Sequence, residues 1–276
     1  MSTAPHHHAA SRTPAKAGRT VRFRIKRCDG PGQPSRWEEF DLSIPPGANV
    51  ISCLQQIAAS PVTIEGRRTT PVVWDSGCLE EVCGACTMVI NGKVRQSCSC
   101  IIDALAPADG DVITLEPMSK FPVVRDLWVD RSRLFTDLQR ARAWVPIDGT
   151  YALGDGPRES PEQQQQRYVM STCMSCGCCL EACPQYHLQP DPETADGFVG
   201  AAVINQVRLF NEHATGAVLA TERLDLMLEP GGIADCGNSQ NCVKVCPKEI
   251  PLTESIAAIG RAATIHGFKR FFTARR

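Results

Sequence analysis

Apolar and polar residues alternate near the start of the chain, which is the pattern of β-strands. Residues 21–25 alternate between apolar and basic side chains, and this period of two predicts a strand with one buried face. After a turn that contains proline and glycine, the segment from Trp37 to Ile44 predicts the partner strand. Asn49 is placed to cap a following helix that ends near Ala59.

A tight hairpin is predicted further along the same region. Met88 and Ile90 lead into Asn91-Gly92, and this dipeptide favours a two-residue hairpin because both residues tolerate a left-handed backbone. Residues 112–115 predict a last short strand.

Residues 121–150 are predicted to form a bridge between two regions. Leu127, Leu134 and Leu138 have the spacing of a helix with one buried stripe. Residues 148–158 are rich in glycine, aspartate and proline, and this composition predicts a loop between domains.

From Ser160 onward the pattern is helical. Ser160 stands before Pro161 and three residues before Gln163, the arrangement of a capping box with proline in the first turn. Three later helices are predicted: residues 202–210, residues 219–228 and residues 253–265, the last with Thr253 as its cap.

This order of strands and helices predicts an α+β protein with two domains. The predicted segments are a disordered tail (1–19), a β-rich domain (20–125), a connecting helix and linker (126–159) and a helical domain (160–276). The tail contains three histidines at residues 6–8, for which a flexible tail is favoured over a metal site.

Composition narrows the function classes. The formal net charge of −1 gives no electrostatic reason to expect nucleic acid as a partner. No stretch has the roughly 20 apolar residues of a membrane span, so membrane association is expected to go through a partner. The first 30 residues contain no apolar signal segment. Without an export signal, 15 cysteines favour metal or cluster ligation over disulfides.

The first cysteine motif has the spacing of a plant-type [2Fe–2S] site, C-x4-C-x2-C with a fourth cysteine downstream. Its predicted ligands are Cys78, Cys83, Cys86 and Cys98. Gly77, Gly84 and Ala85 are small enough to let the backbone approach the sulfurs. Structural zinc usually takes two short cysteine pairs around one ion, so this spacing favours [2Fe–2S] over zinc.

Two further runs have the bacterial ferredoxin spacing, in which three cysteines hold one cluster and the fourth reaches another. They are Cys173, Cys176, Cys179 and Cys183 before Pro184, and Cys236, Cys242 and Cys246 before Pro247. Ser239 stands where the second run would have its middle cysteine. Cross-ligation predicts [4Fe–4S] on Cys173, Cys176, Cys179 and Cys246, and [3Fe–4S] on Cys183, Cys236 and Cys242, because a cubane with three thiolates can lose its unanchored iron.

The remaining four cysteines are Cys28, Cys53, Cys100 and Cys178. We interpret Cys28 and Cys53 as small core residues and Cys178 as a packing residue beside the clusters. The spacing favours Cys98 over Cys100 as the fourth [2Fe–2S] ligand.

No catalytic residue is predicted. The sequence contains no phosphate loop, no G-x-G-x-x-G and no H-E-x-x-H. His187 follows Cys183 by four residues, and a role near the third cluster and a surface position are equally consistent with it. The three motifs therefore favour an electron-transfer chain over a site for chemistry on a bound substrate.

The three motifs in this order resemble the iron–sulfur subunit of succinate dehydrogenase and fumarate reductase, respiratory complex II. The matching runs are Ser76 to Cys86, Cys173 to Pro184 and Cys236 to Lys248, within residues 20–265. The resemblance implies a β-grasp [2Fe–2S] ferredoxin-like domain followed by an all-α bacterial-ferredoxin-like domain. It also implies the same three sets of cluster ligands.

The resemblance further implies the partners and the activity. A flavoprotein subunit would oxidise succinate on FAD, and electrons would pass through [2Fe–2S], [4Fe–4S] and [3Fe–4S] to quinone. A membrane-anchor subunit, in some members with haem, would help to form the quinone site. The chain would then be the iron–sulfur subunit of succinate dehydrogenase (quinone), peripheral on the cytoplasmic face of the plasma membrane.

Two positions depart from the ubiquinone-using members of the family. Those members have a histidine where this chain has Gly237 and a tryptophan where it has Leu188. The run from Cys236 to Cys242 looks more like bacterial members that use menaquinone. Pro184 is the only matching residue left for the vicinity of the quinone.

Three alternatives remain open from the sequence. Fumarate reductase would use the same clusters in the opposite direction. A free soluble carrier with several clusters would have no fixed flavoprotein or anchor partner. A zinc-stabilised interaction module would contain no iron.

Overall fold

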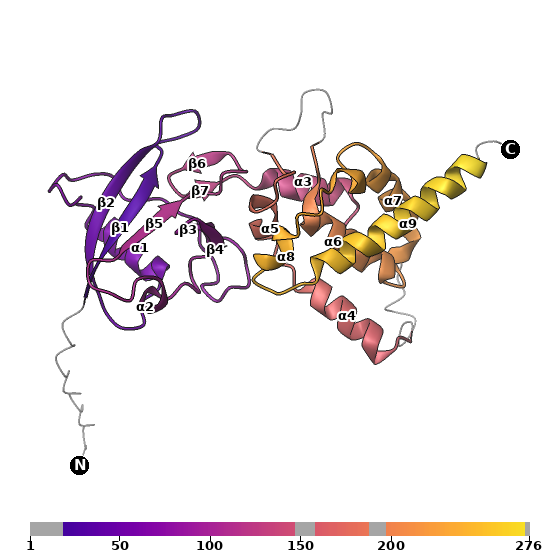
Figure 1. Ribbon diagram of the computed structural model, residues 1–276, viewed down its shortest axis with the longest axis horizontal. Coiled ribbons are helices and arrows are strands. Elements are labelled where there is room, and N and C mark those ends of the chain that lie inside the picture. Colours follow the sequence, from indigo (N-terminus) through magenta and orange to yellow (C-terminus); the bar gives the residue numbers. More distant parts are fainter. Residues whose placement is uncertain (1–18, 147–157, 188–196, 274–276) are drawn as a thin grey trace, which may run out of the picture.

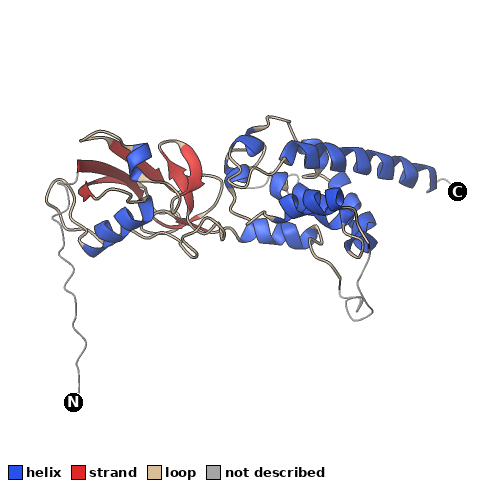
Figure 2. Cartoon of the chain, turned by 90° about the horizontal axis from the view of Figure 1, so that it is seen from below, coloured by secondary structure: helices blue, strands red, loops and turns tan. Residues whose placement is uncertain are grey.

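The computed structural model describes residues 19–146, 158–187 and 197–273 (Figure 1). Nearly all of the predicted tail (1–19) and of the predicted loop (148–158) lies outside these residues, as does Leu188. The strands lie at one end of the molecule together with helices α1 (Val50–Ala59) and α2 (Ile102–Leu105), and the later helices lie at the other end (Figures 1 and 2).

A mixed five-stranded sheet forms the core of the first region, in the order β2-β1-β5-β3-β4. Its strands are β1 (Arg19–Arg27), β2 (Arg36–Ile44), β3 (Thr87–Ile90), β4 (Lys93–Gln96) and β5 (Val112–Glu116). β1 pairs antiparallel with β2 and parallel with β5. The strands predicted from alternation are confirmed, because the side chains of Val21, Phe23 and Ile25 are fully buried on one face. The Asn91-Gly92 hairpin is confirmed by the antiparallel pairing of β3 with β4, in which Ile90 pairs with Lys93.

Helix α1 (Val50–Ala59) adds its apolar face to the same core. The predicted cap is confirmed: the Ser52 backbone N–H donates to Asn49 Oδ1 at 2.9 Å, and the Ser52 hydroxyl accepts from the Asn49 backbone N–H at 3.1 Å. A short helix, α2 (Ile102–Leu105), follows the hairpin.

The bridge differs from the prediction in its first part. Leu127 does not lie on a helix but in the turn of a two-stranded hairpin, between β6 (Val123–Arg125) and β7 (Trp128–Val129). Helix α3 (Ser132–Arg140) begins only after it. Asp126 causes the difference, because its left-handed φ of 48° turns the chain between the two strands. Leu127 therefore packs in the core of the sheet region, whereas Leu134 packs in the helical core.

The second region is helical. Its elements are α4 (Pro161–Ser171), α5 (Cys178–Glu181), α6 (Gly200–Glu212), η2 (Gly216–Leu219), α7 (Ala220–Leu228), η3 (Ile233–Asp235), α8 (Asn241–Lys244) and α9 (Leu252–Thr273). The capping box of Ser160 and Gln163 is confirmed. α9 begins at Leu252, so Thr253 is not its cap; the Pro251 carbonyl instead accepts from the N–H groups of Glu254 and Ser255.

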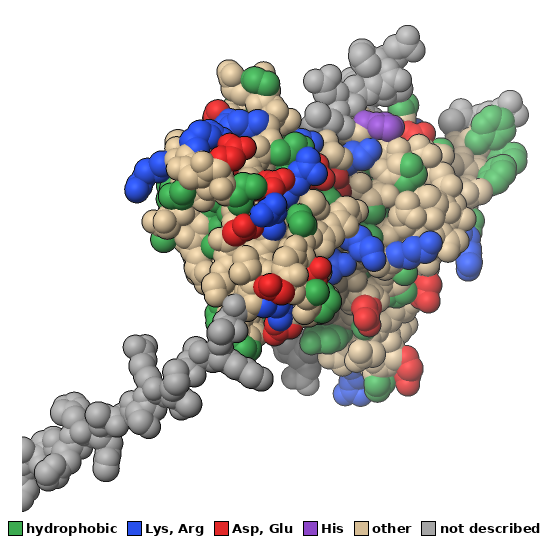
Figure 3. Space-filling view, turned by 60° about the vertical axis from the view of Figure 1, so that its left-hand side comes forward, with side chains coloured by type: hydrophobic (Ala, Val, Ile, Leu, Met, Phe, Trp, Pro, Cys, Tyr) green, Lys and Arg blue, Asp and Glu red, His purple; other side chains and the backbone are tan. Residues whose placement is uncertain are grey.

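Acidic and basic side chains are interspersed on the face of the sheet region that Figure 3 displays. Partly exposed ion pairs also join β1 to β2; Arg22 Nε, for example, lies 2.8 Å from Asp41 Oδ1. In the part of the chain that the structure describes, no helix is both long enough and apolar enough to span a bilayer.

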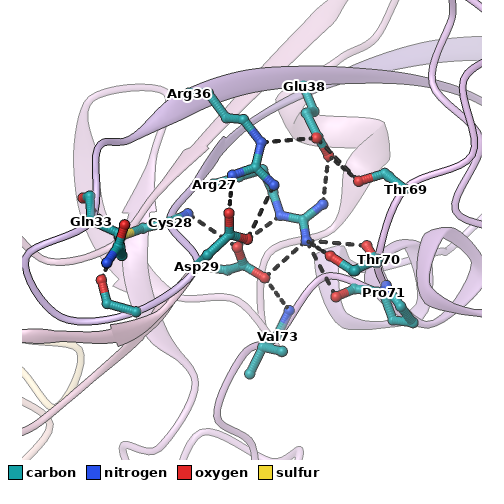
Figure 4. A network of polar contacts seen from close by, with 12 residues as sticks. Arg27, Cys28, Asp29, Gln33, Arg36, Glu38, Thr69, Thr70, Pro71 and Val73 are labelled. Carbon is teal, nitrogen blue, oxygen red and sulfur yellow. Dashed lines mark hydrogen bonds and ion pairs between the residues drawn. The ribbon is translucent and has the colours of Figure 1, made fainter.

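A buried ion network ties the sheet to the chain that leads to the helical region (Figure 4). The side chains of Arg27, Glu38 and Asp126 are 0 % exposed. Arg27 Nη1 donates to Glu38 Oε2 at 2.6 Å, and Arg27 Nε donates to Asp126 Oδ1 at 2.9 Å. Asp126 Oδ2 also accepts from the Val73 backbone N–H at 3.0 Å. The network fixes both the segment before the first cysteine loop and the turn before α3.

We expect Arg27→Met to destabilise the sheet region by about 3–5 kcal/mol, because it leaves the Asp126 carboxylate buried without a cation. Urea unfolding followed by circular dichroism measures the free energy. The control is Arg24→Met, whose exposed guanidinium stacks on Trp37 with 4.6 Å between its Cζ and the ring centroid. The control should lose less than about 1 kcal/mol; equal losses would contradict the role of the network.

Candidate iron–sulfur sites

The loop that holds the first three cysteines is shaped to face its backbone N–H groups toward sulfur. Leu79 and Glu81 have left-handed φ angles of 61° and 56°. The N–H groups of Glu80 and Val82 donate to Cys78 Sγ at 3.3 and 3.4 Å. These hydrogen bonds, with the Glu80 N–H as the largest contribution, lower the pKa of Cys78 to about 7. Such a concave array of N–H groups is typical of anion and iron–sulfur sites.

The hairpin of β3 and β4 brings the fourth cysteine to the other three. The Ser97 backbone N–H and hydroxyl both donate to the Cys86 carbonyl, at 3.1 and 2.8 Å. Cys98 therefore lies beside Cys86 and Cys78; burial and these neighbours raise its pKa to about 12. Four sulfurs on one loop and one hairpin fit a binuclear cluster.

Cys100, two residues after Cys98, is also buried. It lines the groove between the two regions, together with Ala104 and Pro247. Burial raises its pKa, and the neighbouring Arg95 lowers it.

A cavity in the helical region brings together all four predicted ligands of the second cluster. Cys173, Cys176, Cys179 and Cys246 line it, together with Ala202, Ile250 and Leu252. Ser175 and Gly177 have left-handed φ angles of 50° and 87°. Like the first loop, this one therefore has two left-handed residues that are two positions apart. The thiol of Cys178 hydrogen-bonds to Cys176 and lowers its pKa to about 7. Four thiols around an apolar cavity fit a cubane cluster.

A second cavity brings together the three predicted ligands of the third cluster. Cys183, Cys236 and Cys242 line it, and Ser239 is part of the same wall. Asn238 and Gln240 have left-handed φ angles of 51° and 60°. The two cavities draw on the same two sequence runs, because Cys183 follows α5 and Cys246 follows α8. The residues fit a cluster with three protein thiolates.

No three His, Cys, Asp or Glu side chains converge on one metal ion within residues 19–146, 158–187 and 197–273. A cubane does not need such convergence, because each thiolate binds a different iron atom.

The remaining residues singled out in the sequence are either exposed or buried in the core. Pro184 is exposed, and so is His187, whose carbonyl accepts from Arg133 Nη1 at 2.6 Å. Cys53 is fully buried in α1 and Cys28 is buried beside Gly30, so both are core residues, as predicted. Cys178 is buried beside the second site.

Backbone contact joins the first cysteine loop to the second. A Cβ on Gly84 would lie 2.7 Å from Cys176 Cα and 2.9 Å from the Met174 carbonyl oxygen. Gly84 therefore allows close approach to the neighbouring loop, whereas Gly77 makes room for a sulfur, since its Cβ would lie 3.1 Å from Cys83 Sγ.

Arg131 bridges the two loops at this contact, and no sequence motif indicates this role. Its Nη1 donates to the Gly84 carbonyl at 2.7 Å and to the Ser175 carbonyl at 3.3 Å. Asp75 lies 3.7 Å from the same guanidinium. No spacing in the sequence marks Arg131, because it acts on backbone oxygens of two distant loops.

Comparison with known proteins identifies the family. Residues 22–136 match the family described as a 2Fe-2S iron-sulfur cluster binding domain, and residues 169–250 match the 4Fe-4S dicluster domain. The chain is 52 % identical over 258 residues to the succinate dehydrogenase iron-sulfur subunit of Bacillus subtilis, covering 94 % of this chain and 98 % of that protein. The chain belongs to the family of succinate dehydrogenase iron–sulfur subunits. The resemblance drawn from the cysteine motifs is thereby confirmed.

More distant relatives of this iron–sulfur subunit include a fumarate reductase iron-sulfur subunit from Wolinella succinogenes. It is 27 % identical over 248 residues, covering 88 % of this chain and 97 % of that protein. A chain of the Mycobacterium smegmatis Sdh1 complex in the apo form matches with a TM-score of 0.75 and 21 % identity, covering 91 % of this chain and 98 % of that chain. The fold is thus an α+β arrangement with a 2Fe-2S domain before a 4Fe-4S dicluster domain.

We expect Gly84→Ala to separate the first loop from the second, because the new Cβ meets the backbone of Cys176. The matched control is Gly92→Ala, which has a similar φ of 73° and no neighbour within 4 Å of the new Cβ. The left-handed conformation should cost both variants about 1–2 kcal/mol. Only Gly84→Ala should also increase proteolysis between the two regions and lower iron content. Identical behaviour of the two variants would contradict the contact.

Proposed function

We propose that this iron–sulfur subunit carries electrons singly from FAD in a flavoprotein subunit to quinone at a membrane anchor during succinate oxidation. The observation that supports this most is the continuity of the three cysteine sites. Gly84 and Cys176 join the first site to the second by backbone contact, and the runs after α5 and α8 each contribute to both later sites. A continuous series of one-electron centres needs no substrate-binding acid or base in this chain.

We propose the ligands from the three cysteine groups. Cys78, Cys83, Cys86 and Cys98 would hold [2Fe–2S]; Cys173, Cys176, Cys179 and Cys246 would hold [4Fe–4S]; Cys183, Cys236 and Cys242 would hold [3Fe–4S]. Iron–sulfur clusters supply reversible one-electron transfer at potentials that hydrogen bonding and burial adjust. In the first loop, the left-handed residues contribute by facing the N–H groups of Glu80 and Val82 toward Cys78 Sγ.

Ser239 supports the three-iron assignment. It lines the third cavity in the place where the ferredoxin spacing has a cysteine. A hydroxyl is a much weaker ligand for iron than a thiolate at neutral pH, because it does not ionise there.

We also propose the folds of the two domains and the location of the complex at the membrane. We expect a β-grasp fold for residues 20–125, a connecting segment over 126–159 and an all-α unit over 160–276. The complex would lie on the cytoplasmic face of the plasma membrane, held there by a membrane-anchor subunit, which in some members of the family contains haem. The exposed Pro184 would be near the quinone.

Menaquinone is the quinone that we propose. A side chain added at Gly237 would meet the end of the Gln185 side chain. The exposed Gln185 side chain is flexible and can move aside, so the support for menaquinone is the run from Cys236 to Cys242, in which Gly237 stands where ubiquinone-using members have histidine.

Iron analysis and electron paramagnetic resonance (EPR) of the purified complex test the function. We expect two, four and three irons in the three centres, nine per chain, and a [3Fe–4S] signal in the oxidised state. A flavoprotein should co-purify, and succinate should reduce all three centres. Two tetranuclear clusters alone, or colourless protein with zinc, would contradict the proposal.

Turnover with succinate and with fumarate decides the direction. The 52 % identity to a succinate dehydrogenase subunit, against 27 % to a fumarate reductase subunit, favours succinate oxidation. Faster fumarate reduction by the complex would reverse this assignment.

We expect Ser239→Cys to convert the third cluster toward [4Fe–4S] and to slow quinone reduction, because the new thiolate can anchor a fourth iron. Ser239→Ala is the control, since it removes the hydroxyl and adds no ligand. Low-temperature EPR should lose the [3Fe–4S] signal only in Ser239→Cys. An unchanged signal would mean that residue 239 does not face the vacant corner.

A further inference from the structure

The C-terminal part of α9 has an exposed apolar stripe. Ile265, Phe268 and Phe272 are three and four residues apart, so they share one face of the helix. Their side chains are 49, 62 and 65 % exposed, and the neighbouring Phe271 is 51 % exposed. The three residues of the stripe line one hollow of the surface together with Lys269. Single exposed apolar side chains are ordinary, but a contiguous group of them marks a contact surface.

The opposite face of α9 packs against the rest of the helical region. Ala263 is fully buried in the core of that region. A Cβ on Gly267 would lie 3.5 Å from Leu228 Cδ1 on α7. Arg270 Nη1 donates to Asp225 Oδ1, also on α7, at 2.7 Å. The helix is thus held by one face, and the stripe on the other face is left for a contact outside this chain.

The same stretch of chain is strongly positive. Residues 255–276 contain five basic residues and no Asp or Glu, whereas the whole chain has a formal net charge of −1. The five are Arg261, Lys269, Arg270, Arg275 and Arg276. Arg261 and Lys269 are exposed, and each is four residues from Ile265, so both lie beside the stripe. The surface around the stripe is therefore suited to a partner with negative charge.

The helix also points away from the sheet region. Thr253 and Ile256, near the start of α9, line the third cavity. From there the helix runs to the end of the molecule that is opposite the sheet region, and its last turns project beyond the other helices (Figures 1 and 2). In the proposed function, electrons enter at the sheet region and leave from the third site. The stripe is then on the side of the molecule where the membrane is expected.

We propose that residues 265–273 of α9 bind the surface of an anionic phospholipid bilayer. Ile265, Phe268 and Phe272 enter the boundary between headgroups and acyl chains, and Lys269 and Arg261 contact lipid phosphates. Aromatic and aliphatic side chains with Lys and Arg beside them are typical of helices that lie on a membrane, and anionic lipid attracts cations close to its surface. An apolar protein surface would match the stripe but not the excess of positive charge. The contact adds to the one made through the anchor subunit, and its direction rests on the proposed function.

Co-sedimentation of the full-length subunit, loaded with its clusters, with lipid vesicles measures this contact. We expect binding to vesicles of phosphatidylcholine mixed with phosphatidylglycerol and much weaker binding to phosphatidylcholine alone. Binding should decline as the salt concentration rises, because salt screens the attraction. The vesicles contain no protein, so the anchor subunit contributes nothing. Wild-type subunit that stays in the supernatant with both kinds of vesicle would overturn the proposal.

The aromatic side chains are tested by Phe268→Ser with Phe272→Ser. This double variant should bind the mixed vesicles at least about tenfold more weakly, because it removes two large apolar side chains from the contact. The matched control is Phe135→Ser on α3, since Phe135 is 53 % exposed and lies outside the stripe. The control should bind as the wild type does. Equal losses in the double variant and the control would contradict the role of the stripe.

The positive charge is tested by Lys269→Glu. This variant should bind the mixed vesicles roughly 10- to 30-fold more weakly, because an attraction becomes a repulsion. Its weak binding to phosphatidylcholine alone should not change. Lys93→Glu, at an exposed position of β4, makes the same change in net charge and should bind as the wild type does. An equal loss in Lys93→Glu would mean that net charge rather than α9 drives binding, and would overturn the proposal.

Other occupants of the stripe give different results. Without vesicle binding by the wild type, a dimer that dissociates on Phe268→Ser with Phe272→Ser would assign the stripe to a second copy of this chain. An anchor subunit that no longer co-purifies with that variant would assign the stripe to the anchor. Either result would overturn the lipid contact. EPR of the same samples reports on the proposed function separately, since a subunit that binds vesicles without cluster signals would contradict only that function.

Discussion

The approach of the Gly84 backbone to that of Cys176 is the constraint on which the rest of the structure depends. Electron transfer between two clusters requires that their ligand loops lie close together, and the absence of a Cβ at Gly84 permits this approach. Arg131 bridges the two loops by donating to the Gly84 carbonyl of the first and the Ser175 carbonyl of the second. The two regions of the subunit are therefore joined at the point where the proposed electron path crosses between them.

The buried ion network of Arg27, Glu38 and Asp126 also supports the contact between the two cysteine loops. Arg27 holds Asp126 in the turn of the β6–β7 hairpin, and the chain reaches Arg131 directly after β7. Asp130 then accepts from the N–H of Ser132, the first residue of α3, at 2.8 Å, and this hydrogen bond lowers the pKa of Asp130. The sheet thus positions Arg131, which bridges the two cysteine loops, although the ion network contains none of the proposed cluster ligands.

The three cysteine loops share one backbone conformation, which is suited to binding an anionic cluster. Pairs of left-handed residues two positions apart occur in each loop: Leu79 and Glu81, Ser175 and Gly177, Asn238 and Gln240. A left-handed conformation costs a non-glycine residue about 1–2 kcal/mol. The cost is consistent with loops that are stabilised when the N–H groups they expose bind sulfur.

The sequence by itself determined the family, the strands and caps of the first region, and the grouping of cysteines, because ligand spacing and capping are local properties of the chain. Asn49 and Ser160 cap helices as their sequence patterns predict. Only the tertiary structure decided that Leu127 leaves the predicted helix, that Gly84 meets Cys176, and which face of α9 stays exposed. The physical reason is that these outcomes depend on packing between segments far apart in the sequence. No periodicity or spacing encodes which carbonyl oxygens Arg131 will reach or which face of α9 will pack against α7.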